Sequence, residues 1–420
     1  MSSIAIALLT SLAFLAVQAF VSWLRRLDAA LPLASHPLEL AGSPSPQQAP
    51  SVFEGDAEVD LSVVIPAYNE ELRLPATLDE ALAYLEQRRA KAGAAGAGGA
   101  ALPELSAGAG GASSALSAGA GGASSATPSG GFSYEVIVVD DGSTDGTARV
   151  VAERQRARSP PSARAAGERL RLLRLPRNGG KGAAVRAGVA ASRGKEVLFA
   201  DADGATKFAD VEKLQEKGKA LASGFSGASP RERGREGCGG QGAAGGRRGS
   251  LVAVQRRGGR GASSRCSDGE GEEPRRASRA PLYFVLGSRA HLEAPSRARR
   301  TLARTVLMKG FHLLVFLVVG GSIRDSQCGF KLFSRQVARI FAANQRTTRF
   351  GFDVELIRLA QLTAVPAAEV QVTWTEIPGS KVRLPSMIRM ALELAATLVG
   401  YSTGLWALKA PTWGVLGSAE

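Results

Sequence analysis

The chain has 420 residues, with 52 Lys or Arg against 38 Asp or Glu, so its formal net charge is +14 at pH 7. Such an excess suits nucleic acid, anionic lipid or phosphorylated substrates. Much of it lies in one glycine- and arginine-rich stretch that is nearly free of aromatic residues, which argues against a nucleic-acid-binding protein. The three cysteines have no paired or metal-like spacing, which argues against a disulfide framework and is typical of a domain in a reducing compartment.

The chain opens with an almost unbroken apolar run over residues 4–24. At about 1.5 Å per residue this run is long enough to cross a bilayer of roughly 30 Å, and it predicts a transmembrane anchor. Arg25 and Arg26 follow at once, so the positive-inside bias predicts that the rest of the chain lies in the cytosol. A cleaved signal peptide is the alternative, but the run has no charged segment before it and no clear cleavage site after it. Residues 25–60, rich in Pro, Ser and Ala, are expected to be a linker.

The predicted globular part begins with a buried-type strand at residue 61, which ends in the polar segment 66–71. Leucines recur at helical spacing over residues 74–89 and predict a helix. Residues 91–131 consist mainly of Gly, Ala and Ser and contain a near-repeat. Because such a composition cannot bury a core, we expect a flexible insert there.

Two more strands are predicted, over residues 134–139 and 170–175, and a helix is expected after each, over residues 147–156 and 183–192. The first of these strands ends in Asp140 and Asp141, and the second leads into a glycine-rich turn at residues 177–182.

The glycine-rich turn contains Lys181, which invites comparison with a phosphate-binding loop. A Walker loop needs Ser or Thr after the lysine, and Gly182 stands there, so an NTPase is excluded at this position. Amides at a helix N-terminus together with one lysine can still neutralise a diphosphate. The alternative is a tight turn with a solvated lysine.

A fourth strand over residues 197–200 stops where Asp201 and Asp203 appear one residue apart. Strands that alternate with helices predict right-handed βαβ units and a parallel sheet, whose carboxyl edge binds ligands. Two carboxylates crowded at that edge repel each other unless a cation is present, and hard oxygen ligands suit Mg²⁺ or Mn²⁺ carrying a diphosphate. An acidic loop or a helix cap is the alternative interpretation.

Beyond this strand, the Gly- and Arg-rich residues 223–279 predict a second disordered insert, and the chain rejoins the fold at residues 283–286. Residues 302–319 and 387–408 are largely apolar with charges inside them. We expect both to lie in the lipid headgroup layer, with spanning helices or ordinary core helices as alternatives. Residues 407–420 are expected to be a C-terminal tail.

Four segments in this order, residues 64–70, 138–143, 178–182 and 201–203, resemble the inverting glycosyltransferases of family 2 with the A-type nucleotide-sugar fold. Residues 200–208, 287–292, 324–333, 352–356 and 374–381 are similar to segments of the dolichyl-phosphate β-glucosyltransferases within that family. The resemblance covers most of residues 61–406 outside the two inserts. It implies an α/β fold, a Rossmann-like GT-A nucleotide-sugar domain, here joined to one N-terminal transmembrane helix and membrane-facing interfacial helices.

The resemblance also implies a reaction and a place. Glucose would be transferred from UDP-glucose to dolichyl phosphate with inversion, giving dolichyl β-D-glucosyl phosphate for N-glycan assembly. The chain would be a single-pass protein of the endoplasmic reticulum membrane with its catalytic domain facing the cytosol. Two alternatives stay open: a dolichyl-phosphate mannosyltransferase that uses GDP-mannose, and a non-catalytic nucleotide-sugar-binding membrane subunit.

Carried onto this sequence, the resemblance implies roles for residues that follow the predicted strands. Asp203 would hold the metal, Mg²⁺ or Mn²⁺, with Asp201 beside it on the nucleotide and as a second ligand, and Lys181 would lie near the diphosphate. Asp140 or Asp141 would contact the uracil or the ribose. Other residues implied to line the nucleotide pocket are Pro66, Ala67, Asn69 and Glu70.

A phosphate monoester acceptor is already mostly dianionic at neutral pH, because its second pKa is about 6, so no general base is required. Cations are needed instead, and the candidates for the acceptor phosphate are Arg289, Arg304 and Lys309. Asp325 is interpreted as a catalytic-site contact to the sugar or to the acceptor. Asp353 and Glu355 either contribute to the site or support a loop.

Overall fold

The structure is a computed structural model that describes residues 3–29, 37–39, 47–48, 51–97, 131–158, 169–226, 281–292, 302–377 and 384–409. Within these ranges the side chains of residues 3–13 and 302–308, and of a few residues at element ends, lie outside the description. The fold belongs to the unit formed by residues 1–222 and 281–420.

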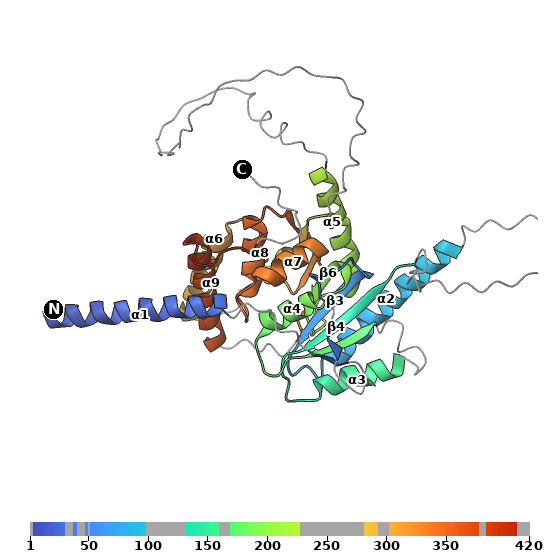
Figure 1. The fold of residues 1–420 in the computed structure, drawn as a ribbon, viewed down its shortest axis with the longest axis horizontal. Coiled ribbons are helices and arrows are strands. Elements are labelled where there is room, and N and C mark those ends of the chain that lie inside the picture. The colour runs from blue at the N-terminus through green and yellow to red at the C-terminus, as the bar shows by residue number, and fades with distance from the viewer. Residues whose placement is uncertain are drawn as a thin grey trace, which may run out of the picture. The chain divides into compact units, whose positions relative to one another are not determined.

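The centre of this unit is a mixed sheet with the strand order β2-β1-β5-β4-β3-β6-β8-β7-β9. Its central strands β4, β3 and β6 are labelled in Figure 1. The strands are β1 (Pro37–Glu39), β2 (Gln47–Gln48), β3 (Val59–Ala67), β4 (Tyr134–Asp140), β5 (Leu170–Arg174), β6 (Gly194–Ala200), β7 (Phe284–Ser288), β8 (Phe330–Ser334) and β9 (Ala367–Gln371).

Four neighbouring strands, β5, β4, β3 and β6, are parallel, as predicted. The expectation of a parallel sheet is wrong beyond β6, because β8 runs antiparallel to both β6 and β7. The pairing of Ala200 with Phe330 explains the reversal, since β8 begins where β6 ends. A run of buried apolar residues predicts a strand but does not encode its direction.

The strand order places a topological switch point between β3 and β6. From β3 the chain moves outward to β4 and β5, and it then returns past β3 to form β6. At such a point the connections leave in opposite directions, and a crevice opens at the carboxyl ends of the two strands. Residues 66–70 and 201–203 therefore meet at the edge where a ligand is expected.

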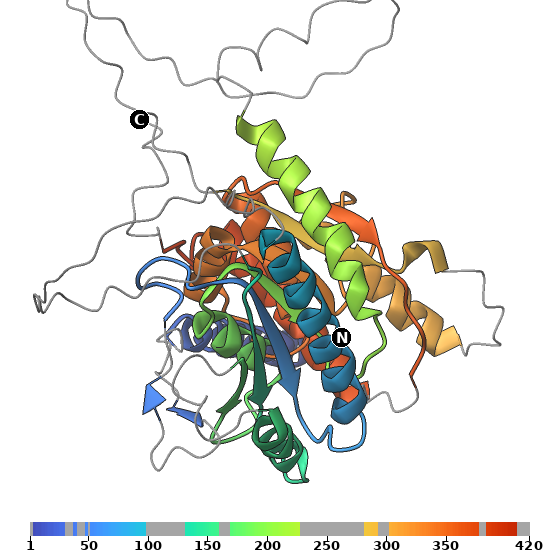
Figure 2. The same cartoon turned by 90° about the vertical axis from the view of Figure 1, so that its right-hand side faces the viewer.

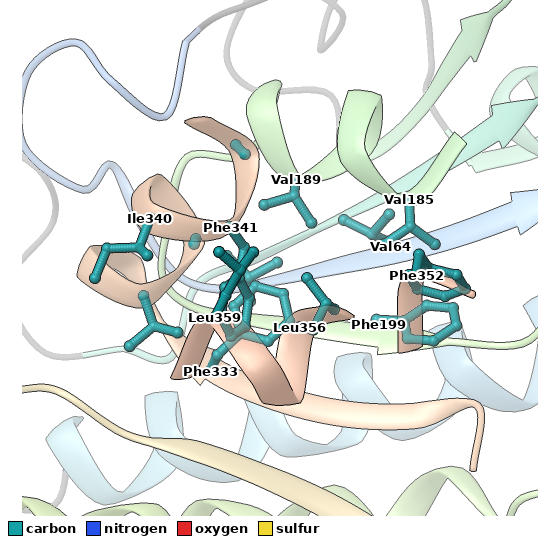
Figure 3. Close-up of a cluster of buried hydrophobic side chains, with 14 of the residues drawn as sticks. Val64, Val185, Val189, Phe199, Phe333, Ile340, Phe341, Phe352, Leu356 and Leu359 are labelled. Carbon is teal, nitrogen blue, oxygen red and sulfur yellow. The ribbon is translucent and has the colours of Figure 1, made fainter. Parts of the chain in front are cut away.

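Helices cover both faces of the sheet (Figures 1 and 2). The core on one face, shown in part in Figure 3, joins the sheet to α4, α7 and α8, and the core on the other face joins it to α2, α3 and α5. Phe199 and Leu198 of β6 are both fully buried, one in each core. Burial on both faces accounts for the unbroken apolar strands. The helices are α1 (Ser3–Ala29), α2 (Leu74–Ala97), α3 (Thr147–Arg158), α4 (Lys181–Ala190), α5 (Val211–Ser226), α6 (Leu302–Val319), α7 (Arg335–Asn344), α8 (Phe352–Leu362) and α9 (Leu384–Ser402).

Several boundaries differ from the expected ones. The expected linker, residues 25–60, contains the end of α1, the strands β1 and β2 of the sheet and the start of β3. Helix α2 continues to Ala97, so the first residues of the segment 91–131 are helical, and residues 98–130 lie outside the described part of the chain. Helix α5 continues to Ser226, so the segment 223–279 also begins inside a helix. Its residues from 227 onward again lie outside the described part. In both cases helix propensity persists into the glycine-containing sequence.

Helix α1 contains the expected anchor, and its C-terminal end docks on the globular unit. Leu24 is fully buried, and its carbonyl accepts a hydrogen bond from Trp406 Nε1 at 3.2 Å. Asp28 Oδ1 accepts a hydrogen bond from Arg346 Nε at 2.8 Å. Over the residues that the structure describes, none of the helices combines the length and the apolarity that a bilayer crossing requires.

Candidate active site

Asp201 occupies the first position after β6, and two neighbours, Gly329 and Lys181, fix it. Its amide donates to the carbonyl of Gly329 at 2.9 Å. Lys181 Nζ donates to its Oδ2 at 3.0 Å and lies 2.7 Å from its Oδ1. A Cβ atom at position 329 would stand 1.9 Å from Asp201 Oδ2. Only glycine therefore allows the backbone of β8 to approach the carboxylate this closely.

Lys181 is the first residue of α4, and its ammonium group lies among carboxylates. Burial lowers the pKa of Lys181, but Asp201, Asp353 and Asp203 together outweigh burial and raise the pKa above its ordinary value. Its Nζ also lies 5.3 Å from the ring centroid of Phe199. The lysine is thus cationic at physiological pH and faces the carboxyl edge of β6.

A second ion pair, between Lys331 and Asp353, is more deeply buried than the pair of Lys181 and Asp201. Lys331 on β8 is fully buried, and its Nζ donates to Asp353 Oδ1 at 2.6 Å and to the Cys328 carbonyl. Burial raises the pKa of Asp353, although Lys331 and Lys181 oppose the change. The sequence assigned no role to Lys331 and left Asp353 open, although both lie in motifs of the family resemblance.

Four amides in and after the glycine-rich turn are already paired within the protein. Asp141 Oδ1 and Oδ2 accept the amides of Gly179 and Gly180 at 2.7 and 2.8 Å. The amides of Gly182 and Ala183 donate to backbone carbonyls at 3.1 and 2.9 Å. These four amides are already paired, which argues against the interpretation that they neutralise a diphosphate. The alternative, a tight turn with a solvated lysine, also fits only in part, because Lys181 pairs with Asp201.

Asp140 and Asp141, predicted as alternatives for one nucleotide contact, have different environments. Asp141 is buried and fixes the glycine-rich turn, as above. Burial raises the pKa of Asp141, although hydrogen bonds from the two glycine amides oppose it. Asp140 is also buried; its Oδ1 accepts the Ser143 amide at 2.9 Å, and its Oδ2 lies 3.6 Å from Arg174 Nε.

The segment after β3 packs against the loop after β4. Pro66 and Ala67 are the last residues of β3, and Ala67 pairs with Asp140. Asn69 has a positive φ of 53° and accepts the Thr144 amide at 2.8 Å through Oδ1. The left-handed conformation at Asn69 turns the chain away from the sheet, and asparagine tolerates it better than most residues.

Glu70 forms a two-pronged ion pair with Arg73, at 2.7 and 2.6 Å. The hydrogen bond to Glu70 raises the pKa of Arg73, burial lowers it, and the nearby charges of Glu70, Asp203 and Asp201 raise it further. Arg73 was not singled out from the sequence, although it stands one helical turn after Glu70. It is a second cation close to the two aspartates.

Asp201 and Asp203 offer a donor set that fits a divalent cation. Asp201 Oδ1 is buried and lies 2.7 Å from Lys181 Nζ, and Asp203 Oδ1 accepts the Ala205 amide at 3.1 Å. Mg²⁺ is commonly held by one or two carboxylates together with substrate phosphates. In the described ranges no three His, Cys, Asp or Glu side chains cluster as a metal site, so substrate oxygens would have to complete the coordination.

Arg289 and Asp325, predicted as separate substrate contacts, bind each other. Arg289 Nε and Nη2 donate to Asp325 Oδ2 and Oδ1 at 2.7 and 2.8 Å. This hydrogen bonding raises the pKa of Arg289. Burial raises the pKa of Asp325, but Arg289 outweighs burial and holds it below its ordinary value. The arginine also lies 5.5 Å from the ring centroid of Trp374.

The other two cations predicted for the acceptor phosphate are Arg304 and Lys309. Among the described residues, no contact joins either of them to the Arg289–Asp325 pair. Lys309 is exposed on α6. Arg304 belongs to the same helix, but its side chain lies outside the described residues. A depression of about 670 Å³ beside α5 and β9, lined among others by Lys213, Lys217 and His291, contains none of the predicted site residues.

Comparison with known proteins gives consistent matches. The family model described as "Glycosyl transferase family 2" matches residues 126–237. A protein of Homo sapiens described as "Dolichyl-phosphate beta-glucosyltransferase" is 35% identical over 361 residues, covering 86% of this chain and 81% of that protein. Proteins with the same description are 36% identical in Drosophila melanogaster, over 89% of this chain and 83% of theirs, and 29% identical in Saccharomyces cerevisiae, over 84% and 78%.

Among solved structures, glucosyl-3-phosphoglycerate synthase from Mycobacterium tuberculosis in complex with UDP is 16% identical, with 87% of each chain covered and a TM-score of 0.39. This score is too low to transfer any site to the present chain.

Proposed function

The chain belongs to the dolichyl-phosphate β-glucosyltransferase family, and we infer that it transfers glucose to dolichyl phosphate. The relatives that carry this description come from several eukaryotes and align over most of the chain. Their description favours a glucosyl transferase over the mannosyl alternative. The observation that supports activity most directly is the Lys181–Asp201 pair at the carboxyl end of β6, because it joins a cation to a carboxylate at the switch point of the sheet.

We propose UDP-glucose as the donor, bound at this edge with its diphosphate near Lys181. The charge that grows on the departing UDP requires a cation, and a fixed ammonium group supplies one without reorganisation. Arg73 is a second cation beside the aspartates. Asn69 and Glu70 would limit the nucleotide pocket on the β3 side, where hydrogen bonds to Thr144 and Arg73 hold their side chains in place.

We further propose that catalysis depends on Mg²⁺ or Mn²⁺. Asp203 and Asp201 would hold the ion, and the position of both carboxylates directly after the carboxyl end of β6 supports this assignment. A bound divalent ion would neutralise the diphosphate and stabilise the leaving UDP. In its absence the two aspartates would disfavour an anionic ligand, so metal and donor are expected to bind together.

We propose that transfer inverts the anomeric carbon in a single displacement. An oxygen of the dianionic acceptor phosphate forms the new bond to carbon 1 while the bond from carbon 1 to the UDP oxygen breaks. The electron pair leaves with UDP, and no proton has to be removed from the acceptor. Asp325 fits this scheme as a partner of Arg289 rather than as a base, because its depressed pKa keeps it ionised and paired.

The location of the reaction is also a proposal: the cytosolic face of the endoplasmic reticulum membrane, with residues 4–24 as the anchor. Exposed apolar side chains on α6 and α9 support a membrane-facing surface. They include Leu313, Phe316 and Leu317 on α6 and Ile388 and Leu392 on α9. These two helices pack against each other (Figure 1).

The test uses membranes that contain the full chain, with labelled UDP-glucose or GDP-mannose, dolichyl phosphate and Mn²⁺ or Mg²⁺. We expect label to enter the lipid phase from UDP-glucose only, to disappear on chelation, and to be lost in Asp203→Ala. The control is Asp79→Ala, because Asp79 is an exposed carboxylate on α2 paired with Arg154. Transfer from GDP-mannose would assign the chain to the mannosyl branch, and UDP binding without transfer from either donor would indicate a non-catalytic subunit.

A further inference from the structure

The buried ion pair between Lys331 and Asp353 is not used by the reaction proposed above. Lys331 is fully buried and Asp353 is 3% exposed, so neither side chain is placed to touch a ligand. Desolvating two charges costs several kcal/mol per ion, and their attraction often only offsets that cost, so a buried pair is weak evidence for added stability. A role other than stability has to be sought in what the pair touches.

The pair is connected to Asp201 through two backbone groups. Lys331 Nζ donates to the carbonyl of Cys328, and the carbonyl of the next residue, Gly329, accepts the amide of Asp201 at 2.9 Å. The same Gly329 lies against the Asp201 carboxylate so closely that no side chain fits. Lys331 thus fixes the segment that sets where Asp201 stands.

The pair is also connected to Lys181, through Phe199. The ammonium groups of Lys181 and Lys331 lie 5.3 and 5.6 Å from the centroid of this ring. Phe352, which precedes Asp353, packs edge-on against Phe199 with 5.7 Å between the ring centroids. Both rings are labelled in Figure 3. The negative charge of Asp353 also acts on Lys181 and favours its charged form.

We propose that Lys331 and Asp353 are positioning residues that hold Asp201 and Lys181 in the arrangement that the donor diphosphate and its cation require. This inference rests on the proposed function, in which Asp201 and Lys181 bind the donor. The two residues act through Cys328, Gly329 and Phe199 and make no contact with the substrate themselves.

The test removes both charges together, in Lys331→Met/Asp353→Leu, because each single substitution would leave one buried charge unpaired and destabilise the fold. Replacing the pair with apolar side chains of similar size is expected to leave the Tm nearly unchanged. The affinity for UDP with Mn²⁺, measured by calorimetry, is expected to fall about 10- to 100-fold, the range seen for residues that orient metal ligands. The Mn²⁺ concentration for half-maximal transfer is expected to rise in the same proportion.

The control is a second buried pair, Arg171 and Glu135, at the start of β5 and β4. In Arg171→Met/Glu135→Leu we expect a lower Tm, because Glu135 also accepts hydrogen bonds from Ser62 and Arg193. Its UDP and Mn²⁺ affinities, measured below the transition, are expected to match the parent protein.

The inference is overturned if Lys331→Met/Asp353→Leu binds UDP and Mn²⁺ with parental affinity. Failure of the proposed function gives a different result: the parent protein binds UDP with Mn²⁺ but transfers no glucose to dolichyl phosphate. In that case the binding measurements still decide whether the pair positions Asp201.

Discussion

Arg289 and Asp325 form one bidentate unit, since two guanidinium nitrogens meet the two carboxylate oxygens and the Arg289 amide donates to Oδ2 at 2.8 Å. The unit places a cation at the end of β7 with its orientation fixed by a carboxylate 36 positions further along the chain. A planar guanidinium held this way can still offer donors to a phosphate on its other edge. We therefore treat Asp325 as a residue that orients Arg289 toward the acceptor.

Asp325→Asn is expected to lower kcat/KM for dolichyl phosphate on the order of 10²-fold, the cost of a misplaced binding group. The KM for UDP-glucose should change little. Steady-state kinetics with each substrate varied in turn measures both constants. Asp325→Glu keeps the charge, and partial recovery of kcat/KM is expected. An equal loss for both substrates would contradict the assignment to the acceptor.

The pH dependence follows from two perturbed groups. Arg289 holds the pKa of Asp325 below its ordinary value. The ionised Asp325 therefore stabilises the fold at any pH above its unfolded-state pKa, and this contribution is lost only as the pH falls through its folded-state pKa. The pKa of Lys181 is raised in the folded protein. The charged Lys181 therefore stabilises the fold fully below about pH 10.4, the unfolded-state pKa of lysine, and this contribution is lost as the pH rises through the folded-state pKa. The unfolded-state pKa values are about 3.9 for Asp and about 10.4 for Lys. Asp325 is therefore charged above about pH 5.5 and Lys181 is charged below about pH 9, so neither group changes charge between these limits.

The transfer rate is therefore expected to rise through a pKa of about 6, that of the acceptor phosphate, and to stay level up to pH 9. Rates measured at subsaturating dolichyl phosphate across this range, with Asp325→Asn in parallel, provide the check. The variant should keep the shape of the profile. Loss of the acid limb in Asp325→Asn would instead identify Asp325 as a general base.

Gly329→Ala tests the close approach of β8 to Asp201. The new Cβ would stand 1.9 Å from Asp201 Oδ2, so the carboxylate or the β8 backbone has to shift. We expect at least a tenfold loss of UDP affinity in the presence of Mn²⁺, comparable to the loss of a metal-ligand support. Gly93→Ala is the control, because a Cβ there meets nothing within 4 Å and helix propensity favours Ala by about 1 kcal/mol. Unchanged UDP affinity in Gly329→Ala would refute this account of the site.

Much of this edge of the sheet could be predicted from the sequence, because strand ends and polar motifs coincide. Strand β6 is buried on both faces and stops at Asp201, so an apolar run followed by a carboxylate located both the strand and the candidate ligand. Asp203 followed from the same pattern, and Lys181 was found from the glycine-rich turn that follows the preceding strand.

The remaining features depend on contacts between distant segments. Lys331 and Asp353 are 22 positions apart, and nothing in the spacing showed that they pair. The pairing of Asp141 with the glycine-rich turn depends on how the loops after β4 and β5 pack, which decides whether an amide is free or bonded. The direction of β8 was unpredictable for the same reason, since it depends on how β8 pairs with the distant strand β6.

Glu355 fixes the loop that supports the glycine-rich turn. Its carboxylate is fully buried and accepts the amides of Arg346 and Thr347 at 2.9 and 2.7 Å and the Tyr401 hydroxyl at 2.9 Å. The carbonyls that follow in this loop accept the amides of Gly182 and Ala183. One side chain thus joins α8 and α9 to the turn that carries Lys181.

Glu355→Gln is expected to lower the free energy of unfolding by about 3 kcal/mol, since an amide nitrogen would face buried donors. A thermal melt measures the loss of stability. Glu153→Gln is the control, because Glu153 is half exposed on α3 and its substitution leaves no buried donor unpaired. The transfer rate should also fall in Glu355→Gln at a temperature where the protein is folded. A Tm equal to that of the control would contradict the assigned role.

The outward faces of α6 and α9 give a prediction about membrane binding. Leu313, Phe316 and Leu317 are 53–58% exposed, and their spacing places them on one face of α6. Lys309 is exposed one turn before them, where an ammonium group can meet lipid phosphates while its stem covers apolar surface. From this position we expect Lys309 to contact lipid headgroups rather than the reacting phosphate.

Phe316→Ser/Leu317→Ser is expected to weaken binding of the protein to vesicles of phosphatidylcholine and phosphatidylserine, because about 1.5–3 kcal/mol is lost for each large apolar side chain kept out of the lipid. Flotation of the protein without residues 4–19, which keeps the docked end of α1 with Leu24, separates this surface from most of the anchor. Leu72→Ser is the control, since Leu72 is 92% exposed but lies outside α6 and α9. Loss of binding in the control to the same degree would show that scattered apolar exposure, rather than the α6 and α9 surface, holds the protein on lipid. Lys309→Gln should reduce binding only to vesicles with anionic lipid, and an equal reduction on neutral vesicles would exclude the headgroup contact.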